Sequence, residues 1–346
     1  MKIAHLFYNL NIGGSETMVI DIMNRQAESE EVALVIINRE NDARLLQTID
    51  SRIKKYIIGR KLGAKNPYPF FRLNALLYRL SPDVVHIHNH HIMPALVRLK
   101  KARYFFTAHT NGIDIMQQKR FDKIFSISEY VAQDIQQRYH RPSEVIYNGI
   151  KTTDITVKTG NEETPRFRMV QIGRQQMHQK GQDLLLRALH LLIHRHHLTD
   201  WSADLIGDGP DTDELKRLAC ELGLENQVTF LGARDRKYIY RHLHEYQLLV
   251  HPSRQEGFGL TIAEAVCAGV PVLIPDIPGP MEIIDGGKYG TSFETGNAEM
   301  CAEKIAAIMQ HYPEYLAKTY PAREFALSHF DIAATAQNYI KAYQTP

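Results

Sequence analysis

The sequence predicts an α/β protein of two domains, each with a parallel sheet covered by helices on both faces. Short apolar runs typical of buried strands alternate with helical patterns roughly ten times along the chain, as parallel βαβ units require. A polar, aperiodic stretch at 151–165, KTTDITVKTGNEETP, interrupts the alternation and is typical of a linker. The 346 residues are enough for two domains of ordinary size. We expect domains at 1–155 and 166–325, followed by a C-terminal segment at 326–346.

The first domain opens with an apolar strand over 3–8, a loop that contains Gly13 and Gly14, and a helix over 16–27. A strand, a Gly-Gly turn and a helix form a phosphate-type turn, although the same pattern also suits a tight strand-to-helix loop. Ser128 is placed to cap the helix that follows it. The remaining patterns predict strands at 32–38, 53–58, 83–88, 104–108 and 124–127, and a helix with one apolar face at 70–77.

Histidines gather near the ends of two of these strands. His86 and His88 belong to a strand, whereas His90 and His91 lie in the loop beyond it. Four histidines so close together suggest a metal site, but no nearby carboxylate or cysteine completes a ligand set, and we expect no metal. His109 follows the next strand, at the carboxyl end where α/β folds bind ligands, although a loop-capping histidine is the alternative.

The second domain repeats the alternation and ends in helices. Asp211-Thr-Asp213 has the spacing of a metal motif, but it precedes a helix, so Asp211 or Asp213 is expected to cap that helix. The patterns predict strands at 167–172, 203–206, 228–231, 248–250 and 270–274, helices at 181–194, 213–221, 238–244 and 261–268, and three further helices over 296–343.

A basic pair follows the first strand of the second domain. Gly173 and Arg174 come directly after the strand, and Lys180 follows after five intervening residues, before Gly181. The carboxyl end of a strand therefore delivers a guanidinium and an ammonium group to one place, where both can bind phosphate oxygens. Taken alone, such a loop is more often a solvated basic surface.

The stretch 251–275 carries an acidic pair around a short helix. Gly257 and Gly259 lie just before the helix, where bare backbone can approach a ligand and the helix start attracts anions. Glu256 lies in the loop, and Glu264 lies on a helix of Ala, Val and Cys that must be mostly buried. Backbone donors for phosphate and carboxylates for hydroxyls suit a polyol-phosphate ligand. The alternative is a tight turn in which Glu256 caps the helix and Glu264 is a core residue whose carboxylate is hydrogen-bonded within the protein.

The segment SRQEGFGLTIAEAVCAGVPV, with Glu256 and Glu264 eight positions apart, resembles the donor-site signature of retaining family 4 glycosyltransferases of the GT-B fold. The pair Arg174 and Lys180 has the spacing of that family's diphosphate-binding residues. GGSE, at 13–16, is similar to a segment that lines the family's cleft. The resemblance runs from residue 1 to about residue 330.

The resemblance implies two Rossmann-like domains facing a cleft, with the C-terminal helix crossing back to the first domain. It also implies the roles of individual residues. The catalytic residues are expected to be Arg174, Lys180, Glu256 and His109; the donor-binding residues Gly13, Gly14, Gly173, Gly257, Phe258, Gly259, Leu260 and Glu264; and the acceptor-side residues Glu16, His88 and His90.

By this resemblance the chain is a metal-independent retaining glycosyltransferase. It would move a sugar from a nucleotide-diphosphate sugar, such as a UDP-sugar, to a glycan or lipid-linked acceptor in cell-surface polysaccharide synthesis. Two alternatives stay open: a sugar-nucleotide 2-epimerase of the same fold, and a non-catalytic sugar-nucleotide-binding subunit. We expect no cofactor and no nucleic acid partner.

Composition indicates a cytoplasmic protein, and the charge of its N-terminal half leaves open whether it binds a membrane surface. Three widely spaced cysteines argue against a disulfide framework, no apolar run approaches the ~20 residues of a membrane span, and the N-terminus lacks a signal-peptide pattern. Residues 1–160 carry 23 Lys and Arg against 15 Asp and Glu, an excess of +8. Part of this charge lies beside Phe70 and Phe71, which suits peripheral binding to anionic lipid. The alternative is that the aromatics are core and the charges a solvated face.

Overall fold

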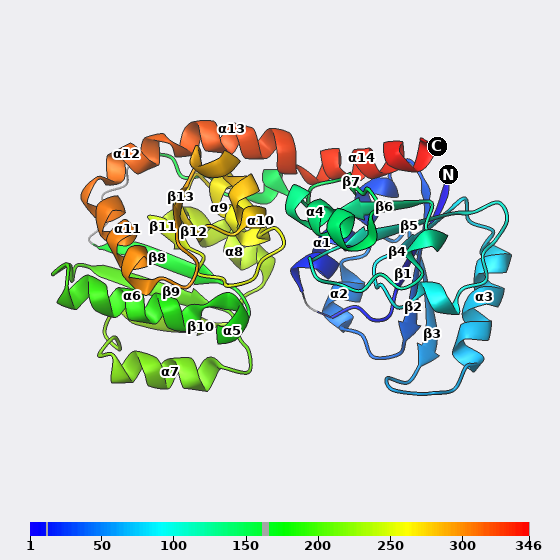
Figure 1. Cartoon of the computed structure of the whole chain (residues 1–346), viewed down its shortest axis with the longest axis horizontal. Coiled ribbons are helices and arrows are strands. Elements are labelled where there is room, and N and C mark those ends of the chain that lie inside the picture. The colour runs from blue at the N-terminus through cyan, green and yellow to red at the C-terminus, as the bar shows by residue number, and fades with distance from the viewer. Residues whose placement is uncertain (12, 161–165, 346) are drawn as a thin grey trace. The chain divides into compact units, whose positions relative to one another are not determined.

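The computed structural model describes residues 1–11, 13–160 and 166–345 (Figure 1). The chain forms two compact units: unit 1 combines Met1–Gly149 with Asp331–Pro346, and unit 2 spans Ile150–Phe330. The chain thus passes between units close to the expected boundaries at 155 and 326. The last part of the expected linker, 161–165, lies outside the described residues. The predicted class, two parallel α/β sheets, is confirmed.

Unit 1 contains a seven-stranded parallel sheet in the order β3-β2-β1-β4-β5-β6-β7. Its central strands are buried on both faces, which is why sequences such as EVALVIIN are almost continuously apolar. The strands are β1 (Lys2–Phe7), β2 (Glu31–Asn38), β3 (Lys54–Arg60), β4 (Val84–Ile87), β5 (Arg103–Ala108), β6 (Lys123–Ser126) and β7 (Glu144–Val145).

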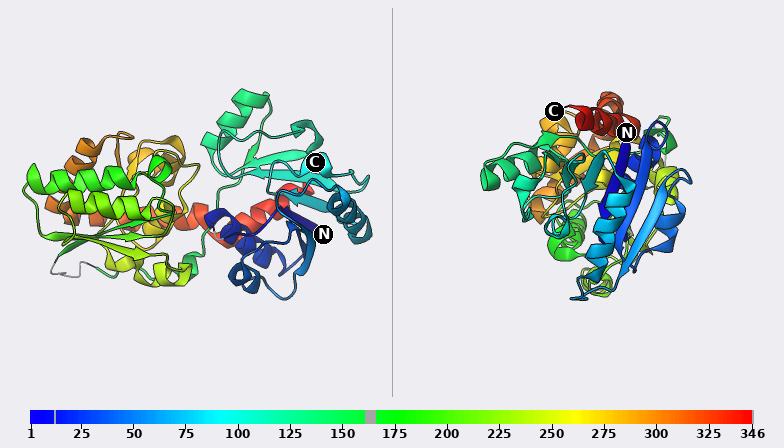
Figure 2. Two further views of the ribbon diagram at one scale, coloured as in Figure 1. Left: turned by 90° about the horizontal axis from the view of Figure 1, so that it is seen from below. Right: turned by 90° about the vertical axis from the view of Figure 1, so that its right-hand side faces the viewer.

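Helices on both faces cover this sheet. The C-terminal helix, α14, contacts α1, and the two run side by side in Figure 2 (left), where α14 is red and α1 is blue. Tyr339 and Tyr343 of α14 are buried in the core of unit 1. Ser128 caps α4 as predicted, by accepting a hydrogen bond from the Val131 amide. The helices are α1 (Gly14–Gln26), α2 (Ala43–Gln47), α3 (Tyr68–Leu80), α4 (Glu129–Tyr139) and α14 (Ile332–Gln344).

Unit 2 contains a six-stranded parallel sheet in the order β10-β9-β8-β11-β12-β13. Its core includes the fully buried Trp201 and the packed helices α6 and α11. The strands are β8 (Phe167–Ile172), β9 (Trp201–Ile206), β10 (Val228–Gly232), β11 (Leu248–Val250), β12 (Val272–Pro275) and β13 (Thr291–Phe293). The helices are α5 (Met177–Lys180), α6 (Gln182–His194), α7 (Thr212–Glu221), α8 (Arg236–His242), α9 (Leu260–Cys267), α10 (Pro278–Ile283), α11 (Ala298–Gln310), α12 (Tyr312–Ala317) and α13 (Thr319–Phe330).

Two details of the predicted elements were wrong. The stretch expected to be a loop between Gly173 and Gly181 contains α5, a single turn too short to show a periodic pattern. Residues 296–343 form four helices, α11 to α14, because His311 and Pro313 interrupt one pattern and Asp331 starts a new helix. The residue Gly269 takes the predicted left-handed conformation, with φ at +73°.

Each sheet reverses its strand order once, between β1 and β4 in unit 1 and between β8 and β11 in unit 2. Loops that leave the carboxyl ends of two such strands diverge, and ligands of open α/β sheets bind in the opening between them. Arg174 follows β8 and Glu256 follows β11, while Gly13 follows β1 and His88 follows β4. Most of the sequence-predicted residues therefore lie at these two switch points.

Candidate functional site

The switch point of unit 2 brings the predicted basic and acidic residues together. The ammonium Nζ of Lys180, at the end of α5, lies 2.7 Å from Oε2 of Glu256. His251 Nε2 lies 3.3 Å from the same oxygen, and Ser253 Oγ lies 2.9 Å from that nitrogen. Burial alone would raise the pKa of Glu256, but the hydrogen bond from His251 and the charge of Lys180 outweigh it and hold the pKa well below its usual range. Glu256 is therefore ionised at neutral pH.

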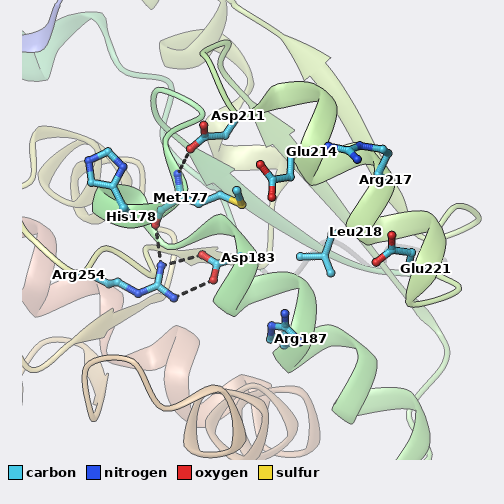
Figure 3. A pocket seen from close by; sticks show the side chains of 10 residues that line it. All are labelled: Met177, His178, Asp183, Arg187, Asp211, Glu214, Arg217, Leu218, Glu221 and Arg254. Carbon is cyan, nitrogen blue, oxygen red and sulfur yellow. Dashed lines mark hydrogen bonds and ion pairs between the residues drawn. The ribbon is translucent and has the colours of Figure 1, made fainter.

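A second ion pair fixes the loop of Glu256 against the helix of Lys180. The Arg254 guanidinium binds both carboxylate oxygens of Asp183, at 2.7 and 2.8 Å, and the carbonyl oxygen of Met177 at 2.6 Å (Figure 3). The Arg254 amide also donates to the Gln179 carbonyl oxygen at 2.8 Å. Bidentate arginine–carboxylate geometry is directional. This clamp therefore sets where Lys180 lies relative to the Glu256 loop.

Glycines permit this close packing. Gly181 has φ at +65°, and a Cβ there would lie 2.0 Å from the Pro252 carbonyl oxygen. Gly207 has φ at +140°, and a Cβ there would lie 1.9 Å from the Gly173 carbonyl oxygen. Any other residue at either position would combine a disfavoured backbone conformation with a backbone clash. The loops that carry the basic pair therefore depend on glycine at these positions.

Asp211 does not cap α7 as expected. It occupies the N-cap position without a side-chain hydrogen bond to that helix, and its Oδ2 instead accepts from the Met177 amide at 2.7 Å. The carboxylate thus starts α5, the turn that carries Lys180. Asp213 lies in the first turn of α7, where a negative charge is favourable.

The other predicted donor residues take different environments. Arg174 is exposed, and its guanidinium forms no ion pair with any residue that the structure describes. Glu264 is 8% exposed on α9, as predicted for a carboxylate on an apolar helix. Gly259 precedes α9 with φ at +109°, so its backbone needs glycine, and Leu260 begins the helix. Phe258 is buried, with its ring 5.3 Å from that of Phe330, so its side chain anchors the loop.

A pocket of about 640 Å³ lies beside this site, between α5, the start of α6 and α7 (Figure 3). It carries charges of both signs, and it includes Arg254 and Asp183 of the clamp but none of Arg174, Lys180 or Glu256. Its lining residues are Met177, His178, Asp183, Arg187, Asp211, Glu214, Arg217, Leu218, Glu221 and Arg254.

In unit 1 the predicted residues fall into separate groups. His88 Nδ1 lies 3.2 Å from His109 Nε2, whereas the half-buried His90 contacts His91, with the rings tilted by 54° and their centroids 3.8 Å apart. Glu16 lies in the first turn of α1, with its carboxylate so close to Gly13 that a Cβ there would lie 2.5 Å from Oε2. Gly14 is exposed at the start of α1.

Ring nitrogens of His5, His86 and His88 lie within 4.8 Å of one another, which is a spacing that a metal could use. However, protein partners occupy every one of these nitrogens. His86 binds the Tyr343 hydroxyl at 2.6 Å and the Thr107 hydroxyl at 2.7 Å, and His5 and His88 bind each other and further groups. The residues fit a buried hydrogen-bond network better than a ligand set.

Comparison with known proteins identifies the class. Residues 153–324 match the family model described as Glycosyl transferases group 1, and residues 12–154 match the model described as Glycosyltransferase Family 4. The chain therefore belongs to the group 1, family 4 glycosyltransferases, as the sequence motifs predicted, and it is an enzyme of the glycosyltransferase class.

Individual relatives agree with this family. An uncharacterised glycosyltransferase of Methanocaldococcus jannaschii is 27% identical over 304 residues, covering 84% of this chain and 79% of that protein. The lipopolysaccharide core biosynthesis mannosyltransferase LpcC of Rhizobium leguminosarum bv. viciae is 36% identical over 135 residues, 37% of each chain. The crystal structure of HepE from Anabaena, in complex with UDP and glucose, has a TM-score of 0.81 at 20% identity over 99% of both chains. This likeness confirms the GT-B fold. No helix among the described residues is long and apolar enough to cross a membrane.

Sequence reasoning missed four residues of these two sites: His251, Arg254, His5 and Gln26. The position of His251, directly after the apolar run of β11, was a signal of the kind that singled out His109. His5 could have been found from the parallel pairing of β1 with β4, which places it beside His86. Nothing in the local sequence indicates that Arg254 binds Asp183 or that Gln26 binds His5.

Proposed function

We propose that this glycosyltransferase moves a sugar, with retention of configuration, from a nucleotide-diphosphate sugar to a hydroxyl group of a glycan or lipid-linked acceptor. We further propose a role in cell-surface polysaccharide synthesis and a chemical step that needs no divalent metal. The name of the lipopolysaccharide core mannosyltransferase LpcC and the UDP and glucose bound to HepE support this substrate class.

The proposal rests mainly on the hydrogen bonds that Lys180 and Glu256 form with each other and on the hydrogen-bonding groups that they leave unused. Lys180 gives one of its three ammonium protons to Glu256 Oε2, and His251 contacts the same oxygen. Within the described residues, no other group occupies Lys180 Nζ or Glu256 Oε1. The pair therefore offers cationic donors for a diphosphate next to an acceptor for a sugar hydroxyl.

In the proposed reaction the bond between the anomeric carbon and the phosphate oxygen breaks. The acceptor oxygen bonds to the same face of that carbon, and its proton passes to an oxygen of the departing diphosphate. The transition state resembles an oxocarbenium ion, and negative charge develops on the leaving group. Arg174, Lys180 and the first amides of α9 would stabilise this charge, which is the main electrostatic contribution. Glu264 would hold the ribose hydroxyls and Glu256 the sugar hydroxyls.

The function is tested by incubating the purified protein with UDP- and GDP-sugars, with and without lipid-linked and soluble glycan acceptors. The proposal expects release of nucleoside diphosphate and a glycosylated product only when an acceptor is present. Glu256→Gln, which keeps the shape of the side chain, should lower turnover. Conversion of the donor without an acceptor would indicate an epimerase. Nucleotide binding without turnover across the acceptors would indicate a non-catalytic subunit.

The surface of α3 supports a membrane-bound acceptor. Tyr68, Phe71 and Tyr78 are 62%, 69% and 77% exposed, whereas Leu73 and Leu77 face the core. The alternative that the aromatics are core therefore does not hold for Phe71, whereas Phe70 is half-buried. Four exposed cations lie just before or within α3 in the sequence: Lys61, Lys65, Arg72 and Arg79. We propose that this face of α3 (Figure 1) rests on anionic lipid, where each cation contributes ~1 kcal/mol.

Co-sedimentation with vesicles tests the membrane surface. The protein should sediment with anionic vesicles at low salt and be released as ionic strength rises, because salt screens exposed charges beyond ~10 Å at 0.1 M. Lys61→Glu and Lys65→Glu, each alone, should weaken sedimentation, and together they should abolish it. The same single substitution at the exposed Lys216 of α7 should leave sedimentation unchanged. Equal binding to anionic and neutral vesicles would favour a soluble acceptor.

A further inference from the structure

A continuous chain of hydrogen bonds crosses the core of unit 1 and ends at His109. Gln26, the last residue of α1, places its Oε1 2.8 Å from His5 Nε2. His5 Nδ1 lies 2.9 Å from His88 Nε2, and His88 Nδ1 lies 3.2 Å from His109 Nε2. These three histidines come from neighbouring parallel strands, with His5 in β1, His88 after β4 and His109 after β5. We call this set the histidine chain.

Burial keeps the rings of the chain neutral. Desolvation lowers the pKa of His5 to about 4 and that of His109 to about 4, and it lowers the pKa of His88 well below its usual range. Repulsion between protonated rings, from His86 first, lowers the pKa of His88 further, because two neighbouring histidines resist being charged together. A neutral imidazole carries one N–H and one bare nitrogen, so each ring in the chain can donate in only one direction.

The amide of Gln26 sets that direction. With Oε1 toward His5, the amide only accepts there, so His5 carries its proton on Nε2 and leaves Nδ1 bare. His88 must then donate from Nε2 to His5, and His109 must donate from Nε2 to His88. The last nitrogen, His109 Nδ1, is consequently a bare acceptor. It is buried and has no hydrogen-bond partner among the residues that the structure describes. The opposite placement of the Gln26 amide, with Nε2 toward His5, would reverse the direction.

We propose that Gln26, His5 and His88 are positioning residues that hold His109 in the Nε2–H tautomer, so that its Nδ1 accepts a hydrogen bond from a hydroxyl of the bound substrate. The hydrogen bond from a substrate hydroxyl to His109 rests on the proposed function. A bare nitrogen attracts a hydroxyl and repels a phosphate or carboxylate oxygen, since two acceptors would face each other. His109 would thereby favour a neutral sugar hydroxyl over a phosphate or carboxylate oxygen.

This assignment gives His88 a different role from the one expected at sequence level. His88 is buried, and both of its ring nitrogens are occupied by His5 and His109. Its contact with a substrate would therefore run only through His109. His90 makes no hydrogen bond to the chain within the described residues, and its acceptor-side role stays a prediction.

Nitrogen-15 NMR of the full chain, labelled at histidine, tests the inference without any substrate. Long-range ¹⁵N–¹H correlations distinguish a protonated ring nitrogen from a bare one, and they should show His5, His88 and His109 as Nε2–H tautomers at pH 7.5. Gln26→Met removes the acceptor that sets the direction and should turn His109 into a mixture of tautomers. Thr107→Val is the matched control: it removes an equally buried hydrogen bond from His86, outside the chain, and should leave His109 unchanged.

Several outcomes would overturn the inference. Wild-type His109 in the Nδ1–H form would show that the chain runs in the opposite direction, and this measurement needs no variant to fold. An unchanged His109 tautomer in folded Gln26→Met would show that the chain does not control it.

The role of His109 in binding a substrate hydroxyl is tested separately, by enzyme kinetics. With a donor that supports turnover, Gln26→Met should raise KM for that donor about twofold, because only about half of an even mixture of tautomers has the bare Nδ1. It should leave the affinity for the free nucleoside diphosphate unchanged. An unchanged KM would remove the role of His109 in binding a hydroxyl. Absence of any glycosyl transfer alongside the predicted tautomers would refute the proposed function and leave the tautomer assignment standing.

Discussion

Replacing Lys180 by Met should separate its effect on stability from its effect on catalysis. Lys180 and Glu256 have side chains that are 21% and 17% exposed, so their pair lies between the surface and the buried case. Removing one partner of a fully buried pair costs ~3–5 kcal/mol, and an exposed pair contributes ~0–1 kcal/mol. Because His251 still contacts Glu256 in the variant, we expect a loss of about 1–2 kcal/mol in the free energy of unfolding.

The effect on turnover should be larger. If Lys180 stabilises charge on the departing diphosphate, its loss should cost ~2–4 kcal/mol of transition-state stabilisation, comparable to the removal of one oxyanion donor. The double variant Lys180→Met/Glu256→Gln no longer buries an unpaired charge. It should recover stability to within about 0.5 kcal/mol of wild type, whereas turnover should stay low.

Urea denaturation at pH 7 and initial rates on the four proteins of this cycle measure both quantities. Lys216→Met, at an exposed position on α7, is the control and should change neither. Turnover within threefold of wild type in Lys180→Met would refute the assignment of Lys180 to the diphosphate. Recovery of turnover in the double variant would show that Lys180 acts only by neutralising Glu256.

Three further predictions concern the fold and the metal. Gly181→Ala should lower the free energy of unfolding by more than ~3 kcal/mol. Gly223→Ala is the control: Gly223 has a similar φ of +68° but open space around the added Cβ, so the loss there should be ~1 kcal/mol. Equal losses would show that the Pro252 contact is unimportant. Folding lowers the pKa values of His5 and His109 from 6.5 to about 4, so the unfolded chain binds protons that the folded chain does not. The free energy of unfolding should therefore be highest above pH 6.5 and decline as pH drops toward 4, by up to ~1.4 kcal/mol per pH unit for each histidine. A flat profile of unfolding free energy between pH 7.5 and 5 would contradict this. Treatment with a chelator should leave the initial rate of transfer unchanged, and activity lost to chelation and restored by manganese would show that the metal-independent step is wrong.

Local patterns predicted which residues carry charge at the carboxyl edge of each sheet, because strands and the loops after them leave a signal in adjacent residues. Arg174, Lys180, Glu256 and Glu264 were singled out in this way. Their contacts could not be predicted, because Lys180 and Glu256 are 76 positions apart and meet only through the pairing of β8 with β11.

The histidine chain illustrates the same limit. His88 and His109 were visible as polar residues at strand ends, but His5 belongs to the chain only through the register of β1 with β4. Gln26 joins from a helix, and its orientation depends on side-chain packing. The burial that keeps these rings neutral is a property of the folded unit, so the direction of their hydrogen bonds could not be derived from the sequence.

Thermal unfolding with added nucleotides tests the central claim, that the switch point of unit 2 binds the diphosphate of a sugar nucleotide. UDP or GDP, together with its sugars, should raise the melting temperature of the wild-type chain, because a ligand at 100 times its Kd stabilises by about 2.7 kcal/mol. The corresponding nucleoside monophosphate should raise it less, and Arg174→Met/Lys180→Met should show little response to either. No shift with any nucleoside diphosphate, or the same shift in the double variant as in wild type, would contradict the claim.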